Sequence, residues 1–438
     1  MRRPSMQSLA PEYAEPARKI ASTLRAAGHV AWLVGGAVRD LALEHPVKDV
    51  DIATDALPDD VERLFTHTKG VGRAFGTMLV VVDGAPAQVT TFRSEAGYSD
   101  SRRPDRVAFG RSAEEDARRR DFTCNALFLD PLDDTLLDPT GGLDDLRARR
   151  LRCVGDARER FAEDGLRLVR MARFAAAFEL HPDAETLAGA RAPAGSIVGD
   201  SGERLLGELE TIFSRRRAHT AFRLLESVGV LERALPGQIA LHPPLRSTAG
   251  VNELRWRALE RLDAPVGIVR GFAVLFDATH GRGASKSDAG SAVLEKLKPS
   301  NEVRAALRDI SAMVAALRAL AALPQPRRSD LIRARRNARF ADALAIACAW
   351  DDASDKDAGV LRRIAASCAE FSAADLRPQP WITSRELEEC GVPRGPRWGE
   401  LLHEAETLQL DAALEGRDAA LLWLAARAGK SGGRERAP

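Results

Sequence analysis

The feature that most constrains the fold is a change in hydrophobic periodicity near residue 155. Short β-rich runs, HVAWLV, VDIAT, MLVVVD, AQVTTF and ALFLD, occupy the first part of the chain and are separated by turn or helix signals. From DARERFAEDGLRLVRMARFAAAFEL onward, the apolar residues recur at helical spacing almost to the end. The pattern predicts an α+β protein in which a small sheet precedes a long all-helical remainder.

Composition excludes several classes of protein. The chain has 438 residues with 45% apolar content, which is ordinary for a globular protein with several cores. No run approaches the roughly 18 apolar residues that span a bilayer. The N-terminus MRRPSMQSLAPEYAEP lacks the apolar region of a secretory signal, so a cytoplasmic protein is expected. The formal charge is +1, so any affinity for nucleic acid must come from local patches.

The cysteines indicate neither a disulfide framework nor a zinc cluster. They are odd in number and contain no CxxC pair. We expect all five to be core residues: Cys124, Cys153, Cys348, Cys368 and Cys390.

Residues 32 to 54, WLVGGAVRDLALEHPVKDVDIAT, combine a glycine pair, an arginine and two aspartates. Side chains two apart in a strand share a face, so Asp49 and Asp51 are expected to point the same way. Two close carboxylates repel unless a cation lies between them, and Mg²⁺ pairs about 3.5–4 Å apart serve phosphoryl displacement in this way. The backbone of Gly35 and Gly36 has no Cβ to obstruct a triphosphate, and Arg39 would add charge. The alternative is a tight turn followed by a solvated strand end, but the combination favours a nucleotide-transfer site.

These motifs, and others after them, resemble the class II tRNA nucleotidyltransferase and bacterial poly(A) polymerase family. GGxVRD followed by DxD resembles the head of that family. Further segments follow in family order: FRSEAGYSDSRRPDRV (92–107), EEDARRRDFTCNAL (114–127), DPTGGLDDL (138–146), AEDGLRLVRMARF (162–174) and GERLLGEL (202–209). ITSRELEECGVPRGPRWGELLHEAETLQLDAAL is similar to the family's tail. The resemblance implies a polymerase-β-like nucleotidyltransferase head on a small mixed sheet, followed by an all-α neck, body and tail.

The domain boundaries expected on this basis follow the breaks in the sequence. We predict a helix over 15–28 within an N-terminal segment 1–30, a catalytic head 31–155, a neck 156–235 that recognises the base, a body 236–375, and a tRNA-binding tail 376–438 with a disordered end.

The segment RRDFTCNAL predicts phosphate and sugar contacts. Arg120 is expected to grip phosphate, because a guanidinium fork matches phosphate oxygens. Asp121 and Asn125, four residues apart if helical, would hold the ribose hydroxyls. The alternative is a surface arginine run with a capping aspartate.

The EDxxR segment is expected to read the base. Asp164, Arg167 and Arg170 recur at three-residue steps on one helical face, while Phe161, Leu168, Met171, Ala175 and Phe178 form an apolar stripe. Cytosine and adenine both present an amino donor beside a ring-nitrogen acceptor. An Asp164 carboxylate and an Arg167 donor therefore fit C and A and leave buried partners unpaired with G or U. The resemblance places Arg170 and Arg173 at further nucleotide contacts. The alternative is an i,i+3 salt bridge on a solvated helix.

Two positions depart from the family pattern. The chain has QVTTFR where the family often has EVTTFR, so Gln88 replaces a possible third carboxylate ligand. Some relatives carry a phosphohydrolase domain with an HD motif. Here Asp277 and His280 stand without an adjacent His–Asp pair, so we expect them to be structural and predict no second active site.

The resemblance implies addition or repair of the 3′-terminal CCA of tRNA from CTP and ATP, with release of pyrophosphate. Asp49 and Asp51 would hold two Mg²⁺ ions, and the body and tail would bind the acceptor arm and elbow of tRNA through shape and backbone charge. Arg394 and Arg397 are candidate backbone contacts, or solvated surface.

Three other functions stay open from the sequence. A poly(A) polymerase would share the catalytic set, but the basic run typical of those enzymes is absent at VGRAFGTMLVVV. A CC-adding enzyme would have a shortened loop where this chain keeps YSDSRRPD, whereas an A-adding enzyme would keep it. An inactive RNA-binding module would explain the helices but not the retained DxD.

Overall fold

A computed structural model describes residues 2–96, 106–110, 112–192, 202–235, 248–262, 265–276 and 288–429. The chain forms two compact units. The first comprises residues 1–248, 264–266 and 287–299, and the second comprises residues 249–263, 267–286 and 300–438. The head and neck segments expected from the sequence lie in the first unit, and most of the body and the tail lie in the second. The five narrower boundaries stay a prediction.

A mixed sheet of seven strands forms the centre of the head, in the order β3-β4-β5-β2-β1-β8-β9. Only β2 and β5 pair in parallel; the other neighbours are antiparallel. The mixed sheet is therefore confirmed. The strands are β1 (Ala31–Val34), β2 (Asp51–Thr54), β3 (Thr68–Gly72), β4 (Thr77–Val82), β5 (Ala85–Thr91), β8 (Phe128–Leu129) and β9 (Leu136–Leu137).

Two small sheets accompany the main sheet. β6 (Arg93–Ala96) pairs antiparallel with β7 (Arg106–Phe109), and β10 (Arg150–Leu151) pairs parallel with β11 (His181–Pro182). The sequence runs identified β1, β2, β4, β5 and β8 but missed the others. β3, with sequence TKGVG, has neither apolar alternation nor buried residues.

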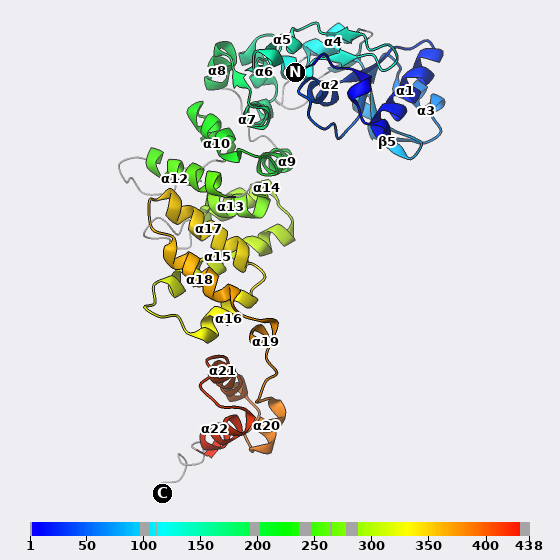
Figure 1. Cartoon of the computed structure of the whole chain (residues 1–438). Helices are drawn as coiled ribbons and strands as arrows, with labels where there is room; N and C mark the ends of the chain where they lie inside the picture. Colours follow the sequence, from blue (N-terminus) through cyan, green and yellow to red (C-terminus); the bar gives the residue numbers. More distant parts are fainter. Residues whose placement is uncertain are drawn as a thin grey trace. The chain divides into compact units, whose positions relative to one another are not determined.

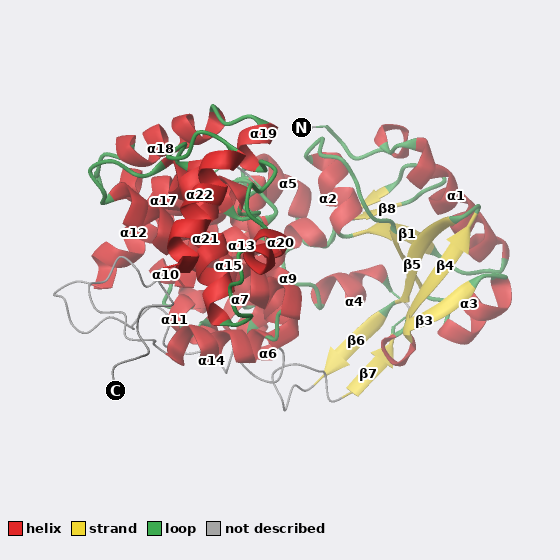
Figure 2. Ribbon diagram, turned by 90° about the horizontal axis from the view of Figure 1, so that it is seen from below, coloured by secondary structure: helices red, strands yellow, loops and turns green. Residues whose placement is uncertain are grey.

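Helices cover both faces of the main sheet. α1 and α3 contact the sheet from one side (Figure 2). On the other face, Ala53 of β2 packs with Ala113 and Ala117 of α4 in a buried cluster. α1 begins and ends earlier than the predicted helix over 15–28, because Pro11 suits the first turn of a helix. The helices of the head are η1 (Met6–Ser8), α1 (Pro11–Ala26), α2 (Gly36–Ala42), α3 (Pro58–Leu64), η2 (Arg73–Phe75), α4 (Ala113–Arg118), η3 (Thr123–Asn125) and α5 (Gly142–Arg147).

The helical remainder of the first unit begins with α6, and α7 packs against α9 and α10 (Figure 1). Its helices are α6 (Ala157–Glu163), α7 (Leu166–Phe178), α8 (Ala184–Arg191), α9 (Gly202–Phe213), α10 (Ala218–Ser227), α11 (Leu231–Ala234) and α14 (Asp288–Leu297).

The EDxxR segment is not one helix, which corrects the sequence-based expectation. Asp164 lies between α6 and α7 with an extended backbone, φ −148° and ψ 104°. Its carboxylate accepts a hydrogen bond from the Leu166 N–H at 3.0 Å, as aspartates do at helix starts. The apolar stripe is still buried, but Phe161 belongs to α6 and the other four residues belong to α7.

The second unit is helical throughout its described part. A separate apolar cluster lies in the tail and includes Ile382, Leu387, Leu401 and Leu424. The helices are α12 (Thr248–Arg261), α13 (Ile268–Phe276), α15 (Asn301–Ala321), α16 (Arg328–Arg336), α17 (Phe340–Ala353), α18 (Gly359–Ala369), α19 (Ala373–Leu376), α20 (Ser384–Glu389), α21 (Pro396–Leu410) and α22 (Arg417–Gly429).

None of the described helices is long and apolar enough to cross a membrane. All five cysteines are free: Cys124, Cys153 and Cys368 are buried, and Cys348 and Cys390 are partly buried. Burial raises the pKa of the Cys124 and Cys153 thiols to about 12. These two thiols therefore stay protonated at neutral pH and belong to the core, as the sequence predicts.

Candidate active site

The two aspartates of the DVD motif lie at the start of β2. Val50 and Ile52 are buried, so the residues between them and beside them face the other way, as the alternation of a strand requires. Asp51 is the first residue of the strand and is partly buried. Asp49 precedes the strand and is exposed. The expected pair of carboxylates on one face is therefore consistent with the backbone pattern.

The electrostatics of Asp51 favour a bound cation. Burial raises its pKa above the ordinary value; Arg120 opposes this shift, and the negative charge of Asp49 adds to it. A cation between the two carboxylates would remove that repulsion, and carboxylate oxygens are suited to Mg²⁺. No group of three or more His, Cys, Asp or Glu side chains suited to a metal occurs among the described residues. Two carboxylates are thus the acidic donors that this site offers.

Gln88 lies directly beside Asp51. The two residues are paired across the parallel strands β2 and β5, and the Gln88 N–H donates to the Val50 carbonyl at 3.0 Å. Gln88 is exposed, while Ala87 and Val89 on either side are buried. Paired residues of neighbouring strands share a face, so Gln88 occupies the place where a third carboxylate would stand beside Asp51.

The glycine pair forms a turn between β1 and α2. Gly35 has φ +64°, in the left-handed region that favours glycine, and a Cβ there would lie 3.0 Å from a guanidinium nitrogen of Arg120. Its N–H donates to the Leu127 carbonyl at 3.3 Å. Gly36 is the first residue of α2, where an N–H has no partner within the helix.

Arg39 of α2 is 7% exposed and lies against the neck. One guanidinium nitrogen donates to Oδ1 of Asn125 at 2.7 Å, and the group lies over the ring of Phe178, 4.2 Å from its centroid. It also donates to Asp40. Arg39 therefore joins the segment after the glycine turn of the head to helix α7.

Arg120 faces the glycine turn from the end of α4. Its guanidinium donates twice to Oδ2 of Asp116, at 3.1 and 2.8 Å, and once to the Asn125 carbonyl at 3.0 Å. It also lies over the ring of Phe128 at 5.1 Å. The Arg120 guanidinium lies close to Gly35, and its positive charge opposes the rise in the pKa of Asp51. Arg120 is therefore near both the turn and the carboxylates, where the sequence predicted a phosphate-binding residue.

Asp121 and Asn125 form a buried link between these arginines. Oδ1 of Asp121 accepts from Nδ2 of Asn125 at 2.9 Å, and Oδ2 accepts from Arg170 at 2.8 and 2.6 Å. Burial would raise the pKa of Asp121, but the charge of Arg170 and the hydrogen bond from Asn125 hold it at about 2. The two residues are not in one α-helix as expected, since Asn125 ends the 3-10 helix η3.

The close approach of another turn holds η3 in place. A Cβ on Gly142, in the DPTGG turn, would lie 2.1 Å from the Thr123 carbonyl oxygen. Only glycine fits at that distance. Asp145 of α5, the helix that begins at Gly142, accepts a hydrogen bond from the Thr123 hydroxyl at 2.7 Å.

The side chains of Asp164 and Arg167 do not pair with each other, so the alternative interpretation of the segment as an i,i+3 salt bridge is wrong. Oδ2 of Asp164 accepts from Arg204 of α9 at 2.6 Å, whereas Arg167 donates to Glu163 at 2.5 Å. Arg167 is 9% exposed and also donates to the Arg160 carbonyl at 3.0 Å.

Arg170 and Arg173 both bind Glu208 of α9. Arg170 lies 3.4 Å from Oε1, and Arg173 donates to Oε2 at 2.6 Å. Burial lowers the pKa of Arg173 and would lower that of Arg170, but Asp121 and Glu208 reverse the shift for Arg170. Both remain guanidinium cations at neutral pH.

Residues that the sequence analysis passed over hold the predicted site residues. Motif matching singled out the arginines but not their carboxylate partners, because a buried acid in a charged motif resembles a solvated one in sequence. The signal available was the spacing: Arg204 and Glu208 are four apart on one face of α9. The added residues are Asp116, Glu163, Phe174, Arg204 and Glu208.

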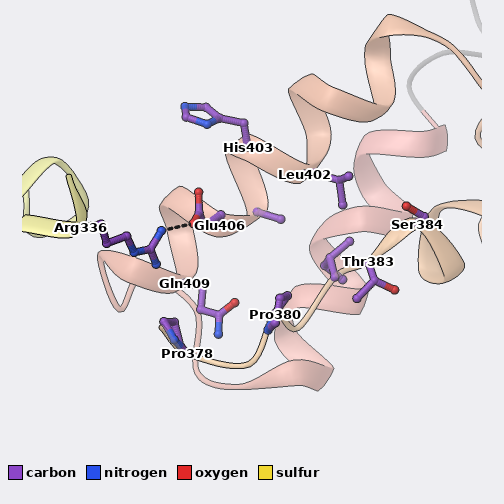
Figure 3. Close-up of a pocket in the computed structure, with 11 residues that line it drawn as sticks. Arg336, Pro378, Pro380, Thr383, Ser384, Leu402, His403, Glu406 and Gln409 are labelled. Carbon is purple, nitrogen blue, oxygen red and sulfur yellow. Dashed lines mark hydrogen bonds and ion pairs between the residues drawn. The ribbon is translucent and has the colours of Figure 1, made fainter. Parts of the chain in front are cut away.

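A pocket of about 400 Å³ lies in the second unit, separate in sequence from these residues. Pro378, Pro380 and Leu402 give it an apolar wall, and Arg336 is paired with Glu406 at its edge (Figure 3). That pairing neutralises the arginine, so the pocket is poorly suited to phosphate.

Three sequence-based predictions lie outside the described residues. They are the loop part of FRSEAGYSDSRRPDRV, residues 97–105, the pair Asp277 and His280, and the expected disorder at the C-terminal end, residues 430–438. Arg394 and Arg397 are described and exposed. Arg394 donates to Oε1 of Glu388 at 3.0 Å and lies over the ring of Trp398, and Arg397 donates to the Arg427 carbonyl at 2.9 Å.

Two family models match this chain. The poly(A) polymerase head domain matches residues 31–152, and the probable RNA and SrmB-binding site of polymerase A matches residues 178–241. Among curated proteins, the CCA-adding enzyme of Geobacillus stearothermophilus is 43% identical over 249 residues, which are 55% of this chain and 61% of the relative. That of Limosilactobacillus fermentum is 45% identical over 198 residues, 45% of this chain and 49% of the relative. The matched segments thus span about half to three-fifths of these relatives.

Solved structures match over nearly the whole chain. The Thermotoga maritima CCA-adding enzyme complexed with tRNA is 18% identical with a TM-score of 0.68, over 96% of this chain and 97% of that one, which shows the fold. The Bacillus stearothermophilus CCA-adding enzyme in complex with CTP has a TM-score of 0.72 and 30% identity, and the match covers 97% of this chain and 99% of that one. With that identity over almost the full length of a solved member, this chain belongs to the CCA-adding enzyme family.

Proposed function

We propose that this protein is a template-independent tRNA nucleotidyltransferase that adds or repairs the 3′-terminal CCA of tRNA from CTP and ATP and releases pyrophosphate. The observation that carries the proposal is a set of interactions from the DVD carboxylates to the neck, electrostatic between Asp51 and Arg120 and hydrogen-bonded from Arg120 onward. Arg120 acts on Asp51, Asn125 binds both Arg120 and Arg39, and Asp121 joins Asn125 to Arg170. Charge and hydrogen bonds thus connect a carboxylate pair to the helices expected to read a base.

The reaction is an attack of the tRNA 3′ hydroxyl on the α-phosphorus of the incoming nucleotide. The family is metal-dependent. Asp49 and Asp51 would hold the metal, expected to be two Mg²⁺ ions, whose charge favours in-line phosphoryl displacement. The side chains of this protein contribute position and charge, because little covalent chemistry falls to the enzyme in phosphoryl transfer.

The triphosphate would lie at the turn formed by Gly35 and Gly36. Arg120 faces that turn from α4, and Arg39 approaches it from α2. Both guanidinium groups are held by protein oxygens, so they are oriented before the nucleotide arrives. Orientation in advance reduces the entropy lost on binding.

The base would be read between α6, α7 and α9. Asp164 accepts from Arg204 through one carboxylate oxygen, and its other oxygen caps α7. Each oxygen still has a lone pair that can accept from the amino group of cytosine or adenine. Arg167 would donate to the ring nitrogen, and Asp121 with Asn125 would bind the ribose side together with Arg170 and Arg173.

The tRNA would contact the helical second unit. The solved relative from Thermotoga maritima was captured with tRNA, and it shares this fold. Exposed Arg394 and Arg397 lie near the start of α21, which suits contact with an RNA backbone recognised by shape and charge. A cytoplasmic location remains a prediction.

Incubation with defined RNA ends tests the proposal. The full chain is incubated with tRNA lacking CCA, with CC-ended tRNA and with an unrelated oligonucleotide, each with labelled CTP or ATP. We expect CTP and then ATP to be added to the first RNA, ATP to the second, and nothing to the third. Addition of ATP to CC-ended tRNA alone indicates an A-adding enzyme, and long A tails on the oligonucleotide indicate a poly(A) polymerase. Asp51→Asn is the control and should be inactive.

A further inference from the structure

The short helix α4 carries a buried aspartate that no part of the proposed reaction uses. Asp116 is 1% exposed. Its Oδ1 accepts from Arg119 at 2.7 Å, and its Oδ2 accepts twice from Arg120. Burial alone would raise its pKa, but the charges of Arg120 and Arg119 hold the pKa below the ordinary value. Asp116 is therefore ionised at neutral pH.

The position of α4 gives these contacts a direction. Ala113 and Ala117 of α4 pack with Ala53 of β2. Ala53 and Asp51 are two residues apart in β2, so they share a face of the sheet. The helix is thus anchored to that face. Arg120 follows the end of α4, and its guanidinium reaches toward Gly35 and Asp51.

Three constraints fix the plane of the Arg120 guanidinium. Asp116 takes Nε and one terminal nitrogen, the Asn125 carbonyl takes the other, and the Phe128 ring lies 5.1 Å from the group. An arginine has five N–H donors, so two remain for an anion. Of the three constraints, Asp116 alone is charged, and it binds through two hydrogen bonds.

We propose that Asp116 is a positioning residue that aims Arg120 at the phosphates of the incoming nucleotide. The proposal rests on the proposed function, because it assigns a role within the same site. Without the carboxylate, the arginine is free to turn toward solvent or toward Asp51, where it would compete with a metal for the carboxylates. Asp116 acts through the phosphate end of the nucleotide, which CTP, ATP and pyrophosphate share, and has no part in choosing the base.

The test compares Asp116→Asn with the wild type in the full chain. The amide has the same shape without the charge. We measure kcat and KM for CTP and ATP on CCA-less tRNA, the preference for CTP over UTP, and the Kd for inorganic pyrophosphate by calorimetry. We expect both KM values and the pyrophosphate Kd to rise by a similar factor of about tenfold, the range for a lost charged hydrogen bond, with unchanged base preference.

A double-mutant cycle separates positioning from structural support. If Asp116 acts through Arg120, Asp116→Asn should add little to the KM of an Arg120→Met enzyme. A purely structural role would add the same factor in both backgrounds and would overturn the proposal. Asp130→Asn is the matched control, since Asp130 is also buried in the head and paired with an arginine, Arg25.

Every outcome has a defined meaning. Unchanged KM values and pyrophosphate Kd in a folded Asp116→Asn enzyme would overturn the proposal. If that variant does not fold, Asp116→Glu keeps the charge but shifts the carboxylate by one methylene, and the same rise in pyrophosphate Kd is expected; no rise would overturn the proposal. A wild type that binds pyrophosphate but transfers no nucleotide would contradict the proposed function instead, and the pyrophosphate measurement would still decide the role of Asp116.

Discussion

At the scale of single residues, the site is defined as much by the partners of the arginines as by the arginines. The sequence motifs identify Arg39, Arg120 and Arg170 because guanidinium groups suit phosphate and base edges. They do not show the partners of Arg39 and Arg170, since those contacts join residues 86 and 49 apart in the chain. The burial of these partners follows from the fold and could not be read from local spacing.

Gln88 is the residue whose chemistry departs most from the family pattern. It faces the same side of the sheet as Asp51, and it brings no charge there. We predict that Gln88→Glu lowers the Mg²⁺ concentration needed for half-maximal rate, because a third carboxylate attracts a divalent ion. The measurement is a Mg²⁺ titration of the initial rate at saturating nucleotide. Gln88→Ala serves as the control for loss of the amide, and an unchanged Mg²⁺ requirement in Gln88→Glu would show that residue 88 does not act on the metal.

Asp121 links stability to pH. Its folded pKa of about 2 lies below the ordinary value of 3.8, so the ionised carboxylate stabilises the fold above pH 4, and this contribution is lost as pH falls toward 2. The difference amounts to about 2 to 3 kcal/mol. Asp121→Asn should therefore lower the free energy of unfolding at pH 7 by about that amount and by less at pH 3. Urea unfolding at both values measures this, and an equal loss at the two pH values would contradict it.

At the scale of elements, the sequence predicts what periodicity encodes. The apolar runs of β1, β2, β4, β5 and β8 are recognisable because one or both faces of each strand are buried, and the long helices are recognisable by their apolar stripes. The error at the EDxxR segment has a local cause. The charged residues Asp164 and Arg167 are spaced as in one helix. However, the Asp164 carboxylate accepts a hydrogen bond from the Leu166 N–H and so begins a new helix. Aspartate favours helix starts over helix interiors, and periodicity alone does not reveal that preference.

The break between α6 and α7 changes how Asp164 would read a base. An aspartate within a helix would lie one turn from Arg167, whereas here its extended backbone places it beside Arg204 of α9. We predict that Asp164→Ala lowers incorporation of both CTP and ATP and raises incorporation of UTP relative to CTP. A lost buried hydrogen-bond partner costs roughly 1–3 kcal/mol, so the preference should fall by about one to two powers of ten.

The same variant distinguishes recognition from stability. The measurement is kcat/KM for all four nucleotides on CCA-less tRNA, with a melting curve beside it. Asp156→Ala is a suitable control, because Asp156 caps the start of α6 and has no proposed contact with the base. An Asp164→Ala enzyme that is folded and keeps its preference for CTP over UTP would exclude Asp164 from base reading.

At the scale of the whole molecule, the residues proposed for nucleotide chemistry all lie in the first compact unit. The second unit has its own apolar cluster in the tail and many neutralised arginines. Arg333 and Arg336 of α16 both pair with Glu406 of α21, so the run RRSDLIRARR, which looks like a basic patch in sequence, is largely used to join two helices. Arg394 and Arg397 are exposed cations elsewhere in this unit. Arg394 pairs with Glu388, but that ion pair is solvent-exposed and therefore weak, so an RNA phosphate can replace it.

This division predicts that tRNA binding and nucleotide binding respond to different substitutions. The double substitution Arg394→Ala and Arg397→Ala should weaken tRNA binding. It should also reduce the slope of log K against log salt concentration by about two, because each lost phosphate contact reduces that slope by about one. The KM for CTP and ATP should not change, because the residues expected to bind nucleotide belong to the other unit. Filter binding at several salt concentrations measures the slope. Arg73→Ala, which removes an exposed arginine of the head, is the control for the loss of charge, and an equal effect of this control would show that the tail arginines contribute only through net charge.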